Sequence, residues 1–437
     1  MEKYTSYIDS EVGWIGEIPS HWTMVNLSVL GRPRKNKNEG NKETNVLSLS
    51  YGRIKQRVLD NTGLLPESFE TYNIIEPGDV VLRLTDLQND QVSLRVGRTT
   101  ERGIITSAYT TLEPVEAESR YLFYLLASFD HWKGFYGLAG GVRQGLNFDG
   151  IRALKYPLPP RNEQIAIADY LDKKLGHIDN ATEEIEKTID LLREYRQSVI
   201  SEAVTRGLNS GTQMKNADLC WISHIPLGWR VVPLKSLFSY GKGLPITKAD
   251  LSDEGVPVIS YGQIHSKANN PAHVVDEIVR FVPASYLETN AASFANEGDF
   301  IFADTSEDVD GCGNFIHVDR KEGLFAGYHT ILFKPADKNY SRYLSYLFQS
   351  QEWRSQIRSK VCGVKLFSVT QRVLSGVNVI IPPQPEQARI ADYLDSKTES
   401  IDKLVRDKQK QVELLKEYRR SLISEAVTGK FKVPGLE

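Results

Sequence analysis

The sequence predicts a mixed α/β (α+β) protein with two tandem domains, each followed by a long helix. The two helices are expected to pair as an antiparallel coiled coil with pseudo-two-fold symmetry. Three observations predict this fold: the chain repeats itself, the repeated blocks carry a heptad pattern, and the segments before them contain short strand-like runs. A chain of 437 residues, 41% hydrophobic and 25% charged, is long enough for each domain to bury its own core.

The repeat is clearest where "EQIAIADYLDKK" (163–174) returns as "EQARIADYLDSK" (386–397). Aligned without gaps, residues 159–205 and 382–428 are identical at 26 of 47 positions. Upstream, "WIGEIPSHW" (14–22) matches "WISHIPLGW" (221–229), "SYGRI" (50–54) matches "SYGQI" (260–264), and "RYLFYLLAS" (120–128) matches "RYLSYLFQS" (342–350). This tandem duplication predicts domains at 1–157 and 209–380, helices at 158–208 and 381–430, and a tail at 431–437. The preserved blocks are expected to perform one task twice, and the diverged domains to meet different targets.

Each preserved block is predicted to form a helix of about 40 residues, roughly 60 Å long, because it is rich in helix formers and its apolar residues recur by sevens. An amphipathic helix lying on a globular core is the alternative. Tyr170, Tyr195, Ile200, Tyr393, Tyr418 and Ile423 fall outside the seam, where they either contact the adjacent domain or form a docking surface that is present twice. The residues predicted to pair the helices are Leu171, Ile178, Ile185, Leu192, Val199, Leu394, Ile401, Val405, Val412, Leu415 and Leu422.

The two domains carry strand-like runs bounded by Gly, Pro or Asn, with one helix each near "SRYLFYLLAS" and "SRYLSYLFQS". Their loops hold Arg, Lys, Asn and Gln, which can pair with base edges or phosphates of DNA. Solvated surface is the alternative for any single loop. The net charge of −3 requires any basic surface to be local. The candidate DNA-binding residues are Arg34, Lys35, Lys37, Tyr51, Arg53, Lys55, Gln56, Arg57, Arg143, Gln144, Tyr261, Gln263, His265, Lys267 and Lys365.

Motifs of catalysis do not occur in this sequence. It contains no phosphate-binding P-loop, no G-x-G-x-x-G after a strand, no paired Cys or His at zinc spacing and no G-x-S-x-G. The acidic run "DTSEDVD" (304–310) is more typical of a solvated turn than of a metal site, and His265 and His329 have no evident partner. A non-catalytic chain without a metal is therefore predicted. Three scattered cysteines and the lack of a signal-peptide core or membrane-length apolar run predict a cytoplasmic protein.

"PPxxEQxxIADYLD", "EYRxSxISEAVT" and the "WIGEIPSHW" that opens each half together resemble the specificity (S) subunits of type I restriction-modification systems, over essentially the whole chain. The resemblance implies two target-recognition domains that read the halves of a split, asymmetric site in double-stranded DNA. It implies spacer helices that bind two methyltransferase subunits, and motor/endonuclease subunits as further partners. This chain would bind no cofactor, with S-adenosylmethionine, ATP and Mg belonging to those partner subunits. No base-reading position transfers by motif match.

Two alternatives remain. One is the recognition subunit of a methylation-only complex, which differs in whether a motor subunit associates. The other is a coiled-coil scaffold that binds protein partners and has no role on DNA.

Overall fold

The computed structural model describes residues 2–57, 68–87, 94–138, 145–363 and 365–436. Its contacts divide the chain into two compact units, unit 1 (residues 1–186 and 409–437) and unit 2 (residues 187–408). The division falls within two long helices, α4 (Arg161–Arg206) and α10 (Gln384–Val427). Each unit therefore consists of one domain and one segment of each long helix. These two helices confirm the predicted ones.

Both long helices end at a glycine. Gly207 follows α4 with φ +78°, and Gly429 follows α10 with φ +71°, conformations that favour glycine. The Gly207 N–H donates to the carbonyl of Ala203, and the Gly429 N–H donates to that of Ala426. The two glycines lie one position apart in the repeat, and their hydrogen bonds differ in spacing, from residue i to i−4 at Gly207 and from i to i−3 at Gly429.

Unit 1 is a set of short antiparallel sheets. Its largest sheet has the order β4-β11-β8-β9. Three antiparallel pairs, β1 with β2, β5 with β6 and β7 with β10, accompany it, and β3 pairs with β12 just before α4. The bounds are β1 Tyr7–Asp9, β2 Glu17–Pro19, β3 Thr23–Asn26, α1 Leu27–Leu30, β4 Gly31–Pro33, β5 Leu47–Ser50, β6 Arg53–Gln56, β7 Asn73–Ile75, β8 Val80–Leu82, β9 Val96–Arg98, β10 Gly103–Ile105, β11 Thr110–Pro114, α2 Ser119–His131, α3 Phe148–Ile151 and β12 Lys155–Leu158.

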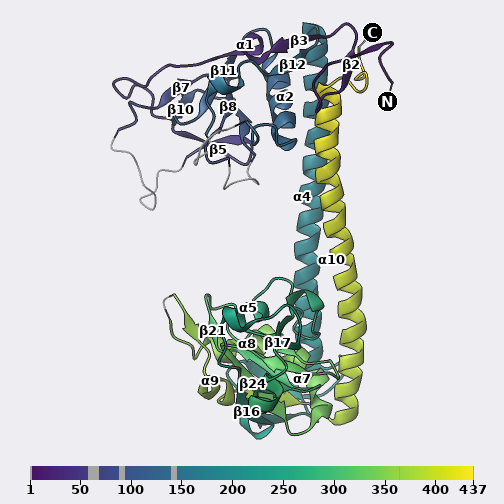
Figure 1. Cartoon of the computed structure of the whole chain (residues 1–437). Helices are drawn as coiled ribbons and strands as arrows, with labels where there is room; N and C mark the ends of the chain where they lie inside the picture. Colours follow the sequence, from purple (N-terminus) through teal and green to yellow (C-terminus); the bar gives the residue numbers. More distant parts are fainter. Residues whose placement is uncertain (1, 58–67, 88–93, 139–144, 364, 437) are drawn as a thin grey trace. The chain divides into compact units, whose positions relative to one another are not determined.

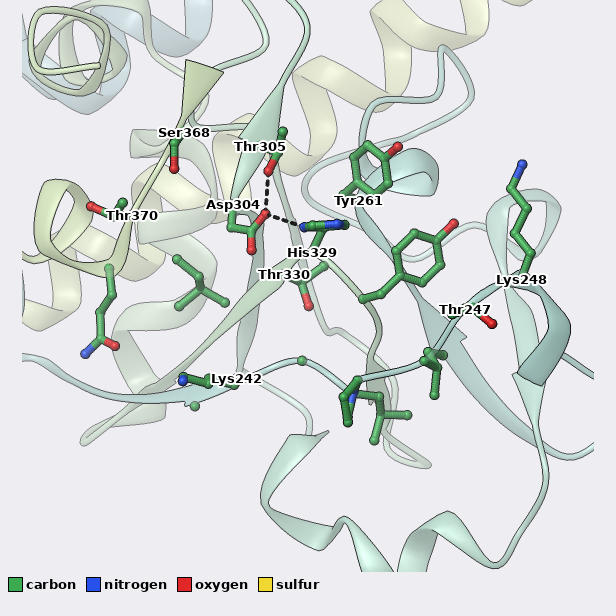
Figure 2. Close-up of a pocket in the computed structure, with 18 residues that line it drawn as sticks. Lys242, Thr247, Lys248, Tyr261, Asp304, Thr305, His329, Thr330, Ser368 and Thr370 are labelled. Carbon is green, nitrogen blue, oxygen red and sulfur yellow. Dashed lines mark hydrogen bonds and ion pairs between the residues drawn. The ribbon is translucent and has the colours of Figure 1, made fainter. Parts of the chain in front are cut away.

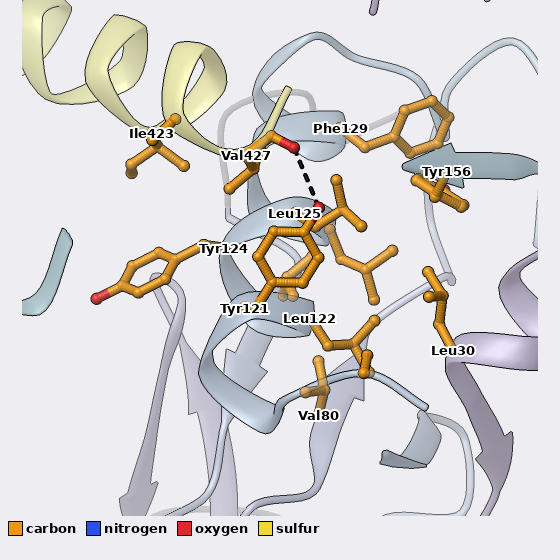
Figure 3. Close-up of a cluster of buried hydrophobic side chains, with 14 of the residues drawn as sticks. Leu30, Val80, Tyr121, Leu122, Tyr124, Leu125, Phe129, Tyr156, Ile423 and Val427 are labelled. Carbon is orange, nitrogen blue, oxygen red and sulfur yellow. Dashed lines mark hydrogen bonds between the residues drawn. The ribbon is translucent and has the colours of Figure 1, made fainter. Parts of the chain in front are cut away.

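The core of unit 1 forms where α2 meets the end of α10, as Figure 3 shows. Leu122 and Leu125 of α2 are fully buried together with Val427 of α10. Each such side chain stabilises the unit by about 1.5–3 kcal/mol through burial. The tail beyond α10 belongs to the same core, since Phe431 and Val433 are buried and the Lys432 N–H donates to the Glu2 carbonyl at 2.8 Å. The two ends of the chain therefore lie together in unit 1 (Figure 1).

Unit 2 contains two four-stranded sheets, with orders β16-β24-β20-β22 and β18-β17-β23-β19. Two-stranded pairs join β13 with β14, β15 with β26 and β21 with β25. The bounds of the strands are β13 Met214–Leu219, β14 Ile222–Pro226, β15 Arg230–Pro233, β16 Phe238–Lys242, β17 Val256–Ile259, β18 Arg280–Val282, β19 Phe294–Ala295, β20 Phe300–Ala303, β21 Thr305–Ser306, β22 Phe315–His317, β23 Leu324–Ala326, β24 Thr330–Pro335, β25 Phe367–Ser368 and β26 Asn378–Ile381. The bounds of the helices are η1 Leu234–Ser236, η2 Lys248–Asp250, α5 Tyr261–Ile264, η3 Asp276–Ile278, α6 Tyr286–Thr289, η4 Ala291–Ser293, η5 Lys338–Tyr340, α7 Ser341–Leu347, α8 Gln351–Arg358 and α9 Gln371–Ser375.

The two units share a sheet with the same topology. The order β4-β11-β8-β9 of unit 1 corresponds strand for strand to β16-β24-β20-β22 of unit 2. The helices predicted near "SRYLFYLLAS" and "SRYLSYLFQS" are present as α2 and α7. The expectation of one helix per domain is too simple, because unit 2 adds α8, which begins where the Ser350 side chain accepts from the Trp353 N–H.

In each unit, α4 and α10 run antiparallel. In unit 1, Arg419 Nε donates to Asp179 Oδ1 at 3.1 Å, and the ring of Tyr170 lies 5.8 Å from that of Phe431. In unit 2, Arg196 Nε donates to Asp402 Oδ1 at 2.9 Å, so the same pair of repeated residues meets again with its roles exchanged. Among the predicted seam residues, those buried are Leu171, Ile178, Val199, Leu394, Ile401, Val412 and Leu422, and those partly buried are Ile185, Leu192, Val405 and Leu415.

Candidate nucleic-acid interface

The residues that repeat in the sequence contact one another in the structure. The Trp22 indole N–H donates to Glu163 at 3.0 Å in unit 1, and that of Trp229 donates to Glu386 at 3.1 Å in unit 2. Each tryptophan comes from the opening segment of a domain, and each glutamate comes from the first turn of the helix that follows. These hydrogen bonds anchor the domain to its own helix in both units.

A second repeated anchor is a buried tyrosine. The Tyr121 hydroxyl lies within hydrogen-bond distance of the Pro157 and Val427 carbonyls, at 3.0 and 3.1 Å. The Tyr343 hydroxyl lies 3.0 Å from both the Val204 and the Ile380 carbonyls. Each hydroxyl therefore links its own domain to the last turn of the helix that belongs to the other repeat.

A third anchor explains why "IADYLD" is preserved. Arg120 contacts Asp169 and Asp172 at 2.6 and 2.8 Å, and the Tyr124 hydroxyl donates to Asp172. In unit 2, Arg342 contacts Asp392 and Asp395, and the Tyr346 hydroxyl donates to Asp395 at 2.6 Å. The preserved part of each repeat is therefore the attachment of a domain to the helices, and the diverged part is free to form a different surface in each unit.

An open groove of about 970 Å³ is a diverged feature of unit 2, shown in Figure 2. It lies between the end of β16, the segment before η2, the turn between β23 and β24, and the strands β21 and β25. The residues that line this unit 2 groove are Gly241, Lys242, Gly243, Leu244, Pro245, Ile246, Thr247, Lys248, Tyr261, Asp304, Thr305, Tyr328, His329, Thr330, Ile331, Ser368, Thr370 and Gln371.

Two glycines allow the backbones that build the groove to approach closely. A Cβ atom on Gly243 would lie 1.8 Å from the carbonyl oxygen of Gly327, so no larger residue fits there without movement. The Gly243 N–H donates to the Thr330 carbonyl at 3.1 Å, and the Leu244 N–H donates to Ala326 at 2.8 Å. Backbone hydrogen bonds thus join the two chain segments that form this wall of the groove.

Besides aliphatic and hydroxyl side chains, the described residues that line the groove contribute basic, aromatic and amide groups and a single carboxylate. Lys242 and Lys248 are exposed, and Tyr261, Tyr328 and His329 form a cluster of rings. Asp304 lies 3.3 Å from Nδ1 of His329 and accepts from the Thr305 hydroxyl at 2.7 Å. This composition suits a polyanion that also presents flat, polar rings, which describes nucleic acid.

Of the candidates predicted in unit 2, only Tyr261 lines this groove. Gln263 accepts from the Ser260 N–H at 3.0 Å in a capping box that starts α5. His265 Nε2 contacts the Thr305 carbonyl at 2.8 Å, and its Nδ1 contacts Asn314 at 3.0 Å. We therefore assign Gln263 and His265 to the framework of the domain, while Lys267 and Lys365 are exposed outside the groove.

The framework beneath β21 continues to Arg354, which also contacts Asn314 and donates to the Asp310 carbonyl at 2.7 Å. Burial and the neighbouring Arg358 lower the pKa of Arg354 to about 10. Among the described residues, no cluster of His, Cys, Asp and Glu could hold a metal ion. In the acidic run at 304–310, Thr305–Ser306 form β21, and the Asp308 carboxylate accepts from the Gly311 N–H at 2.6 Å in the turn that follows.

The equivalent "SYG" in unit 1 has a different structure. Tyr51 and Gly52 form the two-residue turn between β5 and β6, both with positive φ, +47° and +75°. Tyr51 is 75% exposed at the tip, and Arg53 and Lys55 are exposed on the strand that follows. The hairpin therefore presents an aromatic ring and the cation of Lys55, while the Arg53 guanidinium lies 3.7 Å from the Asp179 carboxylate of α4. In unit 2, the capping box of Ser260 and Gln263 turns the same three letters into a helix.

The other candidate DNA-binding residues in unit 1 differ in whether they contact partners within the protein. Arg34 Nε lies 2.6 Å from Asp79 and its Nη2 lies 3.4 Å from Glu113. Burial raises the pKa of Asp79, and contact with Arg34 opposes that rise, so Arg34 has a structural partner. Lys37 donates to the Thr71 carbonyl at 2.8 Å.

Lys35 and Gln56 are exposed, and Arg57 is partly exposed. Arg143 and Gln144 lie outside the described residues.

Four of the six apolar residues outside the helix seam fall into two groups, while Tyr170 packs, partly buried, against the core of unit 1 and Tyr393 is 37% exposed. Ile200 and Ile423 are buried in the cores of units 2 and 1, so they contact the domains. Tyr195 and Tyr418 are 53% and 45% exposed. Leu191 and Leu414, one helical turn before these tyrosines, are 64% and 54% exposed. Each unit therefore carries one copy of an exposed Leu/Tyr patch.

Sequence reasoning did not identify Lys242, Lys248, Tyr328 and Gln371, which reach the groove from distant parts of unit 2. His329 was noticed only as a histidine without a partner, and folding supplies that partner as Asp304. Tyr328 and His329 lie within "LFAGYHTILFKP" (324–335), which is strand-like in sequence, and the structure divides this run into β23 and β24 with both residues in the turn between them.

Among the described residues, no helix is both long and apolar enough to cross a membrane.

Known proteins resemble this chain. The family model of the type I restriction modification DNA specificity domain matches residues 226–414. The MjaVIII type I restriction enzyme specificity subunit of Methanocaldococcus jannaschii is 24% identical over 341 residues, which cover 77% of this chain and 76% of the relative. The putative MjaX specificity subunit of the same organism is 27% identical over 335 residues, 72% and 69% of the two chains.

A chain from a solved structure of a type I restriction-modification system, studied for its complex assembly and conformational transition, has a similar fold. It has a TM-score of 0.68 and 18% identity, with 94% of this chain and 98% of that chain covered.

Proposed function

Because this chain belongs to the family of type I restriction-modification specificity subunits, we propose that its two domains read the two halves of one asymmetric DNA site. One observation carries this proposal: the residues that repeat attach each domain to the helices, while the surfaces that diverge differ in shape and charge. Unit 1 offers the Tyr51 hairpin with Arg53 and Lys55, and unit 2 offers the groove with Lys242 and Lys248. Two different surfaces on equivalent attachments suit two unrelated half-sites.

The phosphates of DNA supply affinity, and base edges supply specificity. Exposed lysines and arginines on both surfaces are expected to contact phosphates, so binding should weaken steeply with salt. The net charge of −3 is compatible with this, because the basic groups are local.

We also propose that the exposed Leu/Tyr patches dock two methyltransferase subunits, one on each unit. Leu191 with Tyr195 and Leu414 with Tyr418 have the same spacing of four residues, which places each pair on one helix face. Exposed apolar side chains at equivalent positions of a repeat suit two copies of one partner. S-adenosylmethionine, ATP and Mg are assigned to the methyltransferase and motor subunits, and this chain is assigned recognition without catalysis.

The test is reconstitution of the complex with its methyltransferase subunits, followed by footprinting and methylation mapping on genomic fragments. A bipartite protected site is expected, and a site without two separated halves would contradict the proposal. Exchange of residues 219–380 for the corresponding domain of another specificity subunit should alter one half-site only. Assembly without any sequence-specific footprint would instead favour a protein-binding scaffold.

Docking is tested in the same preparation by native mass spectrometry. L191D/Y195A should leave one methyltransferase subunit per chain, because the patch on unit 1 is intact. The control is L404D, which changes a leucine of similar exposure (50%) whose counterpart in the other repeat is Ala181. Retention of two methyltransferase subunits by L191D/Y195A would exclude the patch as a docking site.

A further inference from the structure

His329 combines a rare backbone conformation with a position in the unit 2 groove. Its φ is +54°, in the left-handed region that residues other than glycine seldom adopt. Among the described residues, it is the one non-glycine residue of positive φ that lines this groove. Such conformations persist where the surrounding structure enforces them, and they concentrate at functional sites.

The surrounding structure enforces this conformation through the backbone. The Asp304 N–H donates to the His329 carbonyl at 3.1 Å, which connects the end of β20 to the start of β24. The next residue, Thr330, accepts from Gly243 across the groove. The left-handed turn at His329 therefore allows both hydrogen bonds and places the imidazole on the groove wall (Figure 2).

Neighbouring side chains contact the His329 imidazole on several sides. Its ring lies 5.4 Å from that of Tyr261 and 6.1 Å from that of Tyr328, both edge-on. Nδ1 lies 3.3 Å from Asp304, whose own carboxylate accepts from Thr305. Nδ1 is the ring nitrogen that faces Asp304, so Nε2 is the other polar atom of the ring, and the side chain is 60% exposed.

The groove around His329 has a positive charge balance. Lys242 and Lys248 are its lysines, and Asp304, its one carboxylate, already contacts His329 and Thr305. A ligand that meets two cations, an oriented imidazole and two tyrosine rings should carry anionic groups beside polar aromatic rings. A stretch of DNA supplies both, as phosphates beside base edges.

We propose that His329 is a specificity-determining residue that reads one base of the half-site recognised by unit 2. This inference rests on the proposed function, since it requires this domain to read DNA. When Nδ1 beside Asp304 carries the ring proton, Nε2 accepts a hydrogen bond and suits an exocyclic amino group, adenine N6 or cytosine N4. Lys242 and Lys248 contact the flanking phosphates, and Asp304 positions the ring.

The test uses the reconstituted complex with its methyltransferase subunits and duplexes in which each base pair of the half-site is replaced in turn. The main variant is H329N, because asparagine tolerates positive φ and removes the imidazole. Discrimination at one base pair is expected to fall by roughly 10-fold, with the other half-site unchanged. The matched control is H273N, which breaks a similar surface pair, His273 with Asp319 at 2.9 Å, outside the groove.

Two further variants separate reading from phosphate contact and from folding. K242A should weaken binding equally for all sequences and make the salt slope shallower by about one. H329G should lose the same discrimination while unit 2 melts no lower than in the wild type, because glycine accepts the left-handed conformation.

Wild-type discrimination at every base pair in H329N would refute the role of His329, as would an equal loss in both half-sites. A wild-type complex without any bipartite site would refute the proposed function instead.

Discussion

The Tyr343 hydroxyl offers a sharp test of how unit 2 is held to its helices. Tyr343 is 1% exposed, and its hydroxyl lies 3.0 Å from the carbonyls of Val204 and Ile380. Val204 is in the last turn of α4, where carbonyls have no donor within the helix. Tyr343→Phe removes this hydroxyl, and the buried carbonyls of Val204 and Ile380 then lose it as a hydrogen-bond donor.

The expected loss follows from this geometry. A buried neutral hydrogen bond contributes about 1 kcal/mol net, and a buried acceptor left unpaired costs about 1–3 kcal/mol. We expect Y343F to reduce the stability of unit 2 by about 2 kcal/mol. Burial raises the pKa of Tyr343 well above its ordinary value, so the hydroxyl remains a donor at neutral pH and the loss should not vary there.

Hydrogen–deuterium exchange on the full chain measures this loss where it arises. A change of about 2 kcal/mol corresponds to roughly 30-fold faster exchange in peptides from the end of α4 and from β26. The matched control is Y240F, because the Tyr240 hydroxyl is buried without a hydrogen-bond partner among the described residues. Burial raises the pKa of Tyr240 to about 12. Because Y240F removes a hydroxyl that makes no hydrogen bond within the described residues, it should not speed exchange.

Tyr121→Phe repeats the experiment in unit 1, where the last turn of α10 should lose protection. Equal exchange in Y343F and Y240F would refute the idea that this hydroxyl anchors the domain to the helix.

Two further predictions concern the seam and pH. Ile178→Asp places a carboxylate at a position that is 7% exposed and should destabilise unit 1 by about 3–5 kcal/mol and impair complex assembly. I165D, at 41% exposure on the same helix, should melt within a few degrees of the wild type, and equal effects would refute the seam. In unit 2, the hydrogen bond to Asp319 raises the pKa of His273. For Asp319, burial favours a higher pKa, but His273 and the Val274 N–H outweigh it and lower the pKa. The pair should therefore stabilise unit 2 between about pH 4 and about pH 6.5, and this stabilisation should fade as pH rises through the raised pKa of His273. A difference in Tm between wild type and H273Q that does not shrink from pH 6 to pH 8.5 would contradict this assignment.

The periodic features could be predicted from the sequence because they are local. A heptad pattern of apolar residues specifies a helix with one apolar face wherever it occurs. Two such helices in one chain can bury these faces by pairing with each other. The strand-like runs at residues 79–84, 299–303 and 324–335 likewise became β8, β20, β23 and β24. The repeated segments also indicated which parts share a task, and their mutual contacts, such as Trp22 with Glu163, explain why they are preserved.

The sequence repeat gave a wrong expectation of equal structure where the same short segment adopts different backbone conformations in the two units. "SYGRI" and "SYGQI" are nearly the same, yet one is a hairpin turn and the other starts a helix. Gln263 decides the difference, since its side chain caps the Ser260 N–H, whereas Arg53 at the matching position continues a strand. Three letters do not determine a backbone when the next side chain can supply a competing hydrogen bond.

By itself, the sequence determined the duplication, the long helices with their antiparallel seam, and the mixed domains that precede them. Only the tertiary structure decided which polar side chains remain available to a ligand. Lys242, Asp304, His329 and Gln371 span more than a hundred residues and meet because sheets and turns bring them to one groove. His265 and Arg34 look equally suitable in the sequence but are occupied by partners that folding supplies. Hydrogen bonds between residues distant in the sequence produce no periodic pattern in it. Whether a polar side chain is available to a ligand is therefore decided by the fold.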